Sequence, residues 1–166
     1  MNIELLKWEE ENRYELMNIC NGIDRTFISG RMPFPYTEKD ALWWINFTKE
    51  NDGTNGIYRA VVADGKYVGN ISIDKKSDIS CKDCEIGYSL LQLESSKGIM
   101  TEAVKQICEI AFAELDIIRI TAEVFSSNEA SKKVLTKNGF IEEGIKKNAI
   151  YKDEKLYDLI IYGLYK

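Results

Sequence analysis

Residues 84 to 125 constrain the fold of this chain most, because a strand-like run, a helix-like run and a second strand-like run follow one another there. Residues 84 to 91 and 117 to 125 are rich in apolar and β-branched side chains, and residues 98 to 115 form an amphipathic pattern. A strand, a helix and a strand in this order form a crossover that joins parallel strands with a right-handed turn. The sequence therefore predicts an α/β fold with a mixed sheet, in which the two strands around this helix are parallel.

Further helices and strands are expected on both sides of this unit. Thr37 and Asp40 form a capping-box pattern at the start of one helix, Asp64-Gly65-Lys66 is a hairpin turn, and Asn138-Gly139 ends another helix. The expected order is β-α-α-β-β-β-α-β-α-β-β, with the remaining elements at residues 2–7, 9–20, 37–50, 58–63, 67–74, 127–138, 144–151 and 156–165. No linker divides the chain, so we expect residues 1–166 to form a single domain.

The chain contains no histidine, and this removes several kinds of chemistry. Ser-His-Asp catalysis, Cys-His catalysis and histidine general bases all need that side chain. The formal net charge of -5 argues against non-specific nucleic-acid binding, which needs a basic surface. The sequence has no apolar run long enough to cross a membrane and no secretory signal pattern at its start. We therefore expect a soluble cytoplasmic protein that binds neither nucleic acid nor a membrane.

The four cysteines allow three interpretations. Cys81 and Cys84 form a lone CxxC motif, and a zinc site would need Cys20 and Cys108 to join it. A redox dithiol is the second interpretation. Free thiols in a reducing compartment, with the CxxC motif in a hairpin turn, are the third and the one we expect, so no metal is predicted.

The segment from Ser95 to Thr101 lies where the central helix begins. The first backbone N–H groups of a helix have no helical partner, and the helix dipole favours negative charge there. Gly98 and Lys97 add an approachable backbone and a cation, which suits a pyrophosphate. The segment matches neither a Walker A loop nor a GxGxxG motif. From these residues alone it is either a phosphate site or simply a helix start.

Five motifs occur in a fixed order along the chain: Met32–Thr37 with Ala41–Ile45, Glu85–Tyr88, Lys97–Ala103, Asn128–Ser131 with Leu135 and Asn138–Phe140, and Asp158 with Tyr162. Together they resemble the GNAT superfamily of acetyl-CoA-dependent N-acetyltransferases, in particular its branch of ribosomal-protein alanine and serine N-acetyltransferases (RimJ/RimL-like). The resemblance covers nearly the whole chain. It implies the GNAT acyl-CoA N-acyltransferase fold and transfer of acetyl from acetyl-CoA to a primary amine, by direct attack in a ternary complex without a metal.

The resemblance also implies which residues contact coenzyme A. Backbone amides of the loop bind its pyrophosphate, and on this chain the loop comprises Ser95, Ser96, Lys97, Gly98, Ile99, Met100 and Thr101. The family pattern Gln/Arg-x-x-Gly-x-Gly/Ala is matched only at Gly98, since Ser95 and Met100 replace its first and last residues. Ser96 stands where the branch usually has a further glycine, so the resemblance implies a reduced affinity for coenzyme A.

The pantetheine arm is expected between the two parallel strands. The resemblance implies that backbone groups of Leu90 and Leu91 face its amides. Asn128 is the side chain expected to contact the arm. Asparagine is also among the best N-cap residues, and the two roles are compatible.

The resemblance assigns the acid and the base of the reaction less directly than it assigns the cofactor contacts. Many family members use a tyrosine as the acid at the position of Leu135, whereas in the resembling branch a serine takes a comparable place, matched here by Ser131. An exposed helix residue is the alternative interpretation of Ser131. Glu85 is the candidate base, directly or through water, and its alternative is a solvated carboxylate at a strand end. The glutamate that the ribosomal-protein enzymes carry on a later strand is replaced here by Ile150.

The acceptor site is expected beside the two N-terminal helices, in a region that contains Phe34, Tyr36, Trp43 and Trp44, with Phe34, Tyr36 and Trp43 as the substrate-binding residues. Core packing is the alternative for at least one tryptophan. The acceptor is a protein N-terminus or a small amine, and the acidic net charge favours a cationic one. A non-catalytic acyl-CoA-binding or sensing module is the main alternative function, and a nucleotide-binding protein is a third. The sequence leaves the oligomeric state open, a homodimer included.

Overall fold

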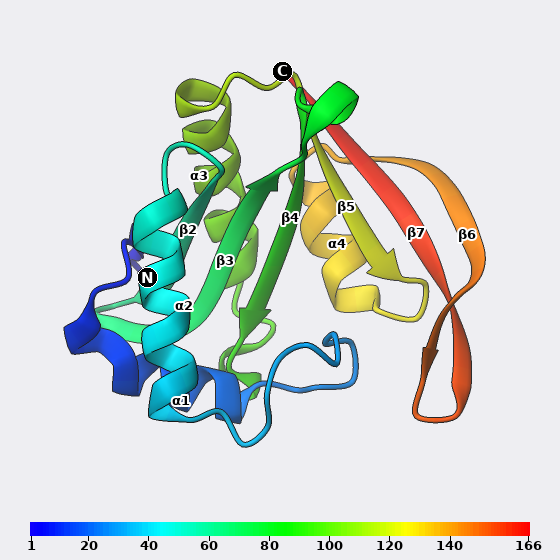
Figure 1. Ribbon diagram of the computed structural model, residues 1–166. Coiled ribbons are helices and arrows are strands. Elements are labelled where there is room, and N and C mark those ends of the chain that lie inside the picture. The colour runs from blue at the N-terminus through cyan, green and yellow to red at the C-terminus, as the bar shows by residue number, and fades with distance from the viewer.

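A mixed sheet of seven strands forms the centre of the computed structural model, which describes residues 1–166 (Figure 1). The strand order across the sheet is β1-β2-β3-β4-β5-β7-β6, and β4 and β5 form its parallel pair. The strands are β1 (Ile3–Leu6), β2 (Gly56–Ala63), β3 (Lys66–Lys75), β4 (Asp83–Leu90), β5 (Arg119–Phe125), β6 (Ile141–Lys152) and β7 (Lys155–Tyr165). The helices are α1 (Arg13–Gly22), α2 (Glu38–Asn51), α3 (Ile99–Glu114) and α4 (Glu129–Lys137).

The observed order of elements is the predicted one, and the local signals that set it are confirmed. The Thr37 hydroxyl accepts from the Asp40 backbone amide, and the Asp40 carboxylate accepts from the Thr37 amide at 2.8 Å, which closes the capping box of α2. Asp64 and Gly65 both have positive φ angles, as the tight turn between β2 and β3 requires. These side chains and turns therefore fix where the elements begin and end.

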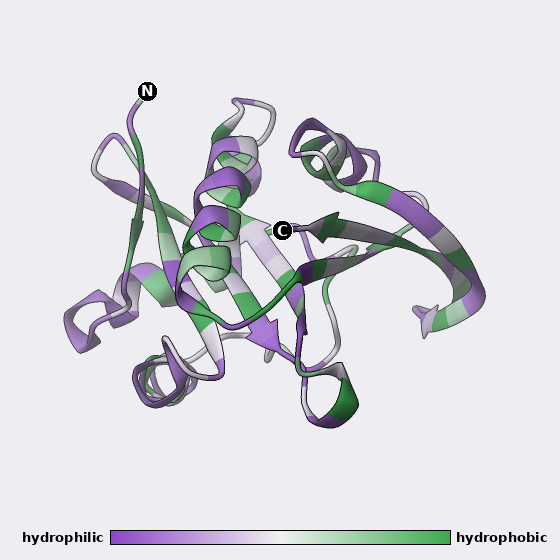
Figure 2. Ribbon diagram, turned by 90° about the horizontal axis from the view of Figure 1, so that it is seen from above, coloured by the Kyte–Doolittle hydropathy of each residue, from purple (hydrophilic) through white to green (hydrophobic).

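The helices cover both faces of the sheet. Figures 1 and 2 show α1 and α2 on one face and α3 and α4 on the other. Successive side chains of a strand point to opposite faces. On β4, Cys84 and Ile86 belong to the core cluster that contains the apolar side of α3, so Glu85, Gly87 and Ser89 face the side of α1 and α2. The face of β4 that carries the polar residues is therefore the one beside the N-terminal helices.

The two parallel strands stay paired over only three positions. Residues Asp83 to Glu85 of β4 pair with Arg119 to Thr121 of β5, and beyond them the strands separate. Figure 1 shows β4 and β5 diverging toward their carboxyl ends. The separation leaves backbone groups of both strands without sheet partners. This is where ligands bind in open α/β sheets.

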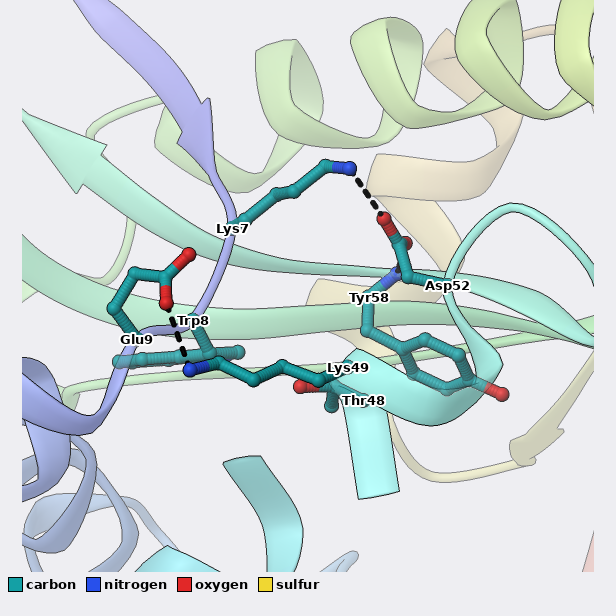
Figure 3. A pocket seen from close by; sticks show the side chains of 7 residues that line it. All are labelled: Lys7, Trp8, Glu9, Thr48, Lys49, Asp52 and Tyr58. Atoms are coloured by element: carbon teal, nitrogen blue, oxygen red, sulfur yellow. Dashed lines mark hydrogen bonds and ion pairs between the residues drawn. The ribbon is translucent and has the colours of Figure 1, made fainter. Parts of the chain in front are cut away.

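An ion pair at the end of α2 fastens this helix to β2. The Asp52 carboxylate contacts the Arg59 guanidinium at 2.5 Å, and both side chains are at least nine-tenths buried. Lys7, whose side chain is 67% exposed, contacts the same carboxylate at 3.1 Å. Figure 3 shows the hollow of about 160 Å³ beside it, where Lys7–Asp52 and Glu9–Lys49 pairs close two sides. Its charges are satisfied within the chain, so we assign this hollow a structural role.

Removing Arg59 should cost far more stability than removing Lys7. The Arg59→Met substitution leaves the Asp52 carboxylate buried without its main partner, which costs about 3 kcal/mol in the free energy of unfolding. The Lys7→Met substitution removes an exposed partner, which costs less than about 1 kcal/mol. Urea unfolding of the two variants measures the difference. Equal losses would contradict the assignment of Arg59 as the main partner.

Candidate functional site

A large cavity lies where β4 and β5 separate. Its volume is about 610 Å³, and its lining comes from both strands, the loop between α1 and α2, the loop before α3 and the start of α4. The lining combines apolar and polar side chains in nearly equal numbers, which suits an organic ligand with both apolar and polar parts. Of the residues singled out in the sequence, it contains Leu90, Ser95, Ser96, Met100, Asn128 and Ser131.

The backbone of β4 contributes to this cavity at Leu90 but less at Leu91. The Leu91 amide donates to the Val68 carbonyl at 2.8 Å, and the Leu91 carbonyl accepts from Glu94 at 2.9 Å. Antiparallel pairing alternates, so the backbone groups of the preceding residue, Leu90, point away from β3, toward the side on which Ile23 forms an isolated bridge with Leu91. The expectation that both residues present their backbone to a ligand therefore needs correction at Leu91, whose groups are used inside the chain.

The loop before α3 has a backbone suited to anions. Gly98 is the N-cap of α3 with a φ of +82°, and no side chain caps the helix there. Ile99 and Met100 turn their side chains into the core, where both are buried, so the first amides of the helix remain available. Ser96 has a φ of +65°, in the left-handed region that favours glycine. A serine thus takes the conformation expected of the glycine it replaces.

The same loop separates the cavity from a second hollow of about 400 Å³. Ser95, Ser96 and Met100 line the cavity, whereas Lys97, Gly98 and Ile99 line the second hollow beside β1. The Lys97 ammonium contacts the Glu94 carboxylate at 2.7 Å and is partly exposed. Thr101 follows in the first turn of α3. The loop therefore offers amides and one lysine at the rim of the cavity.

Two hydroxyl groups meet on the wall formed by β4 and α4. The Tyr88 hydroxyl lies 2.6 Å from the Ser131 Oγ atom, and both residues line the cavity. The Asn128 side-chain oxygen accepts from the Ser131 backbone amide at 3.1 Å, which confirms Asn128 as the N-cap of α4. This cap uses the oxygen of Asn128 and leaves its amide group to donate elsewhere. Burial raises the pKa of Tyr88 to about 12.

Glu85 lies at the last paired position of β4 and is not itself part of the cavity lining. Burial raises the pKa of its carboxyl group although part of the side chain is exposed, and the negative charges of Glu123 and Asp74 raise this pKa further. Glu123 itself lines the cavity from β5 and contacts Lys146 at 2.6 Å. A carboxylate with a raised pKa is a better proton acceptor than an ordinary one.

The three aromatic residues expected in the acceptor wall lie elsewhere. Phe34 is exposed with Arg25 over its ring, Tyr36 is buried in the core under α1 and α2, and Trp43 is 65% exposed. None of the three lines the cavity, whereas Trp44 does. The helical spacing of α2 accounts for the difference, because the buried stripe runs through Ala41, Ile45 and Thr48 and has Trp44 on its edge.

Several cavity residues were not singled out by the sequence argument. They are Tyr88 and Glu123, together with Phe27 and Phe125, whose rings pack edge to face at 5.3 Å. The alternation along β4 and β5 would have placed Tyr88 and Glu123 beside the gap. Phe27 lies in the loop after α1, where no sequence period applies.

The cysteines do not form a common site. All four are free, Cys81 is exposed, and Cys20, Cys84 and Cys108 are buried. No group of three or more His, Cys, Asp or Glu side chains is arranged to hold a metal ion. None of the helices combines the length and the apolar character that a membrane crossing needs.

The comparisons with known proteins agree with this geometry. Residues 2–141 match the family model described as the acetyltransferase (GNAT) domain. The chain is 34% identical over 112 residues to the Bacillus subtilis protein named "Putative ribosomal N-acetyltransferase YdaF", a match that covers 68% of this chain and 61% of that protein. A second B. subtilis relative, named as N-acetyltransferase YjcK, is 34% identical over 117 residues, and the match covers 64% of it. The chain thus spans less than two thirds of either relative.

Solved structures share the fold. Mycobacterium smegmatis RimJ in complex with CoA-disulfide superposes with a TM-score of 0.83 at 20% identity, covering 98% of this chain and 81% of that one. The self-immunity acetyltransferase MccE, in complex with acetyl-CoA and AMP, gives 0.84 at 22% identity, covering 99% and 92%. The mixed sheet with its separated parallel pair is therefore the GNAT acyltransferase fold, and the chain belongs to the family of GNAT acetyltransferase domains.

Proposed function

We propose that the cavity between β4 and β5 binds acetyl-CoA and that the protein transfers its acetyl group to a primary amine. The separation of the two strands beside the start of α3 carries this proposal. Ser95, Ser96, Met100, Leu90 and the hydroxyl pair of Tyr88 and Ser131 line one cavity of about 610 Å³, and the uncapped start of α3 lies at its edge. Membership in the GNAT acetyltransferase family supports the same activity.

Coenzyme A fits this cavity by the chemistry of its parts. The amides of residues 95–101, with the helix dipole and Lys97, suit the pyrophosphate. The backbone of Leu90 and the free amide group of Asn128 suit the two amides of the pantetheine arm. The thioester then lies beside Tyr88 and Ser131, on the same wall of the cavity.

The reaction needs a neutral amine, a reactive carbonyl and a stabilised leaving thiolate. Glu85 accepts a proton from the amine, directly or through a water molecule, and its raised pKa suits this task. The neutral amine nitrogen attacks the thioester carbon, and the carbon–nitrogen bond forms. The nitrogen then loses a second proton to water, and the carbon–sulfur bond breaks with its electron pair on sulfur. The Ser131 hydroxyl donates to that sulfur as the bond breaks.

The acceptor side of the cavity suits an amine that is cationic in solution. Asp24 and Glu123 supply carboxylates there, and Trp44, Phe27 and Phe125 supply aromatic faces. We therefore assign Trp44 to the acceptor wall in place of Trp43. The amine belongs either to a small molecule or to a protein N-terminus, and the name of the relative YdaF is the observation that favours a ribosomal protein.

Binding of acetyl-CoA should depend on the loop before α3. The Gly98→Trp substitution places a large side chain over the free amides, so we expect the affinity for acetyl-CoA to fall at least about tenfold, which is a loss of about 1.4 kcal/mol in binding free energy. Isothermal titration calorimetry measures it. Turnover is then followed as free thiol released in the presence of amines.

Gly65→Trp is the matched control for this experiment. Gly65 also has a positive φ, of +79°, and no atom within 4 Å of an added Cβ, but it lies in the turn between β2 and β3. It should therefore carry the same backbone strain without a loss of affinity. Equal losses in both variants would contradict the loop as the phosphate site, and binding without turnover would favour a non-catalytic acyl-CoA-binding module.

The pH dependence of the rate should report on Glu85. A base must be deprotonated to act, so kcat/KM falls as the pH drops through the raised pKa of Glu85. Glu123→Gln removes a negative neighbour and lowers this pKa, so the acid limb moves to lower pH. Lys146→Met removes a positive neighbour and moves the limb to higher pH.

Both shifts are measured with one acceptor, so the titration of the amine itself is the same in every profile. Glu85→Gln should remove most of the rate at all pH values. Profiles that coincide for wild type, Glu123→Gln and Lys146→Met would exclude Glu85 as the base.

A further inference from the structure

The contact between Tyr88 and Ser131 joins two elements that are far apart in sequence. Tyr88 lies on β4 and Ser131 on the first turn of α4, and their oxygens are 2.6 Å apart on the cavity wall. This distance is typical of a good O–H···O hydrogen bond. The backbone carbonyl of Ser131 is 3.5 Å from the same phenol oxygen, so the serine hydroxyl is the nearer partner.

Each hydroxyl has one hydrogen, and the direction of the bond decides what Ser131 can do. If Ser131 donated to Tyr88, its only hydrogen would be turned away from a ligand. If Tyr88 donates, the Ser131 oxygen is the acceptor and its hydrogen is free to point into the cavity. The Asn128 cap engages the Ser131 backbone amide and not the hydroxyl, so the cap does not compete for this hydrogen.

We propose that Tyr88 is a positioning residue, which donates its hydrogen to the Ser131 Oγ atom and so directs the serine hydrogen toward the departing sulfur of coenzyme A. This inference rests on the proposed acetyl transfer. Neither hydroxyl has to lose its proton. A cysteine thiol has a pKa of about 8.5, so a thiol is acidic enough to leave as an anion. The sulfur of coenzyme A therefore leaves with the electron pair of the carbon–sulfur bond, as a hydrogen-bonded thiolate. It takes a proton from water afterwards.

The surroundings of Tyr88 keep its hydrogen in place. Burial raises its pKa to about 12, so the phenol stays protonated throughout the range in which an amine is acetylated. A chain of two hydrogen bonds ending on an anion polarises each member, which strengthens the bond to the sulfur. The effect should appear in the chemical step and not in the binding of acetyl-CoA.

The test is a double-mutant cycle of Tyr88→Phe and Ser131→Ala. Tyr88→Phe removes one oxygen and keeps the ring. We expect kcat to fall about tenfold, because the hydrogen bond from Ser131 to the departing sulfur is weaker when Tyr88 no longer orients the serine hydroxyl. The KM for acetyl-CoA and its calorimetric affinity should change less than about twofold. In the Ser131→Ala background the same substitution should have no further effect, since Tyr88 acts through Ser131.

Tyr58→Phe is the control. Tyr58 is also buried and donates its hydroxyl to a side chain, Asp74, at 2.8 Å, but it does not line the cavity. Its loss should leave kcat unchanged. An unchanged kcat in Tyr88→Phe, or an equal fall in the wild-type and Ser131→Ala backgrounds, would overturn the positioning role while the transferase function stands. A folded wild-type protein without acetyl-CoA turnover would overturn both.

A fluorinated tyrosine at position 88 tests the same inference without removing an atom from the fold. Trifluorination lowers the phenol pKa, so the group loses its hydrogen as the pH rises through that value. We expect kcat to fall at high pH in this variant and not in wild type. Parallel profiles would overturn the inference.

Discussion

The separation of β4 from β5 is the constraint on which the rest of the site depends. Three residue pairs hold the parallel strands together, and after Glu85 and Thr121 the pairing stops. Backbone N–H and C=O groups inside a protein require partners, and an unpaired buried group costs about 1–3 kcal/mol. The fold therefore leaves strand backbone beside the gap at Leu90, which under the proposed function completes its hydrogen bonds with the amides of the pantetheine arm.

The two faces of the sheet contribute different groups around this gap. On the face of α3 and α4, the loop from Ser95 to Met100 and the pair of Tyr88 and Ser131 surround the space for the acyl donor. On the face of α1 and α2, Trp44 lines the cavity and Glu85 lies near the cavity residue Glu123, on the side proposed for the acceptor. The alternation along β4 places Tyr88 and Glu85 on opposite faces, three residues apart. The proposed base and the proposed partner of the leaving sulfur therefore lie on opposite faces of β4.

The sequence predicted the order of elements well because their signals are local. The capping pair of Thr37 and Asp40, the turn at Asp64 and Gly65 and the βαβ unit each depend on a few adjacent residues. Prediction from the sequence was less successful where packing decides which side chain reaches the cavity. Trp43 and Trp44 are adjacent in sequence, and only the buried stripe of α2 distinguishes them.

The site residues were predictable only where a single element determines their place. Asn128 caps α4 as expected, whereas Leu91 turned out to bond within the chain, because the end of β4 continues its pairing with β3. The contact between Tyr88 and Ser131 spans 43 residues, so no local pattern contains it. The left-handed conformation of Ser96 has a cost on the order of 1 kcal/mol, and only the resemblance to a family with glycine at this position indicates it.

A crystal structure of the protein with coenzyme A tests the central claim most directly. Our account predicts that the pantetheine arm lies between β4 and β5, with the sulfur within hydrogen-bonding reach of the Ser131 Oγ atom and the pyrophosphate on the amides before α3. Coenzyme A bound outside this gap, or inside it with the sulfur directed away from Ser131 and Tyr88, would contradict the account.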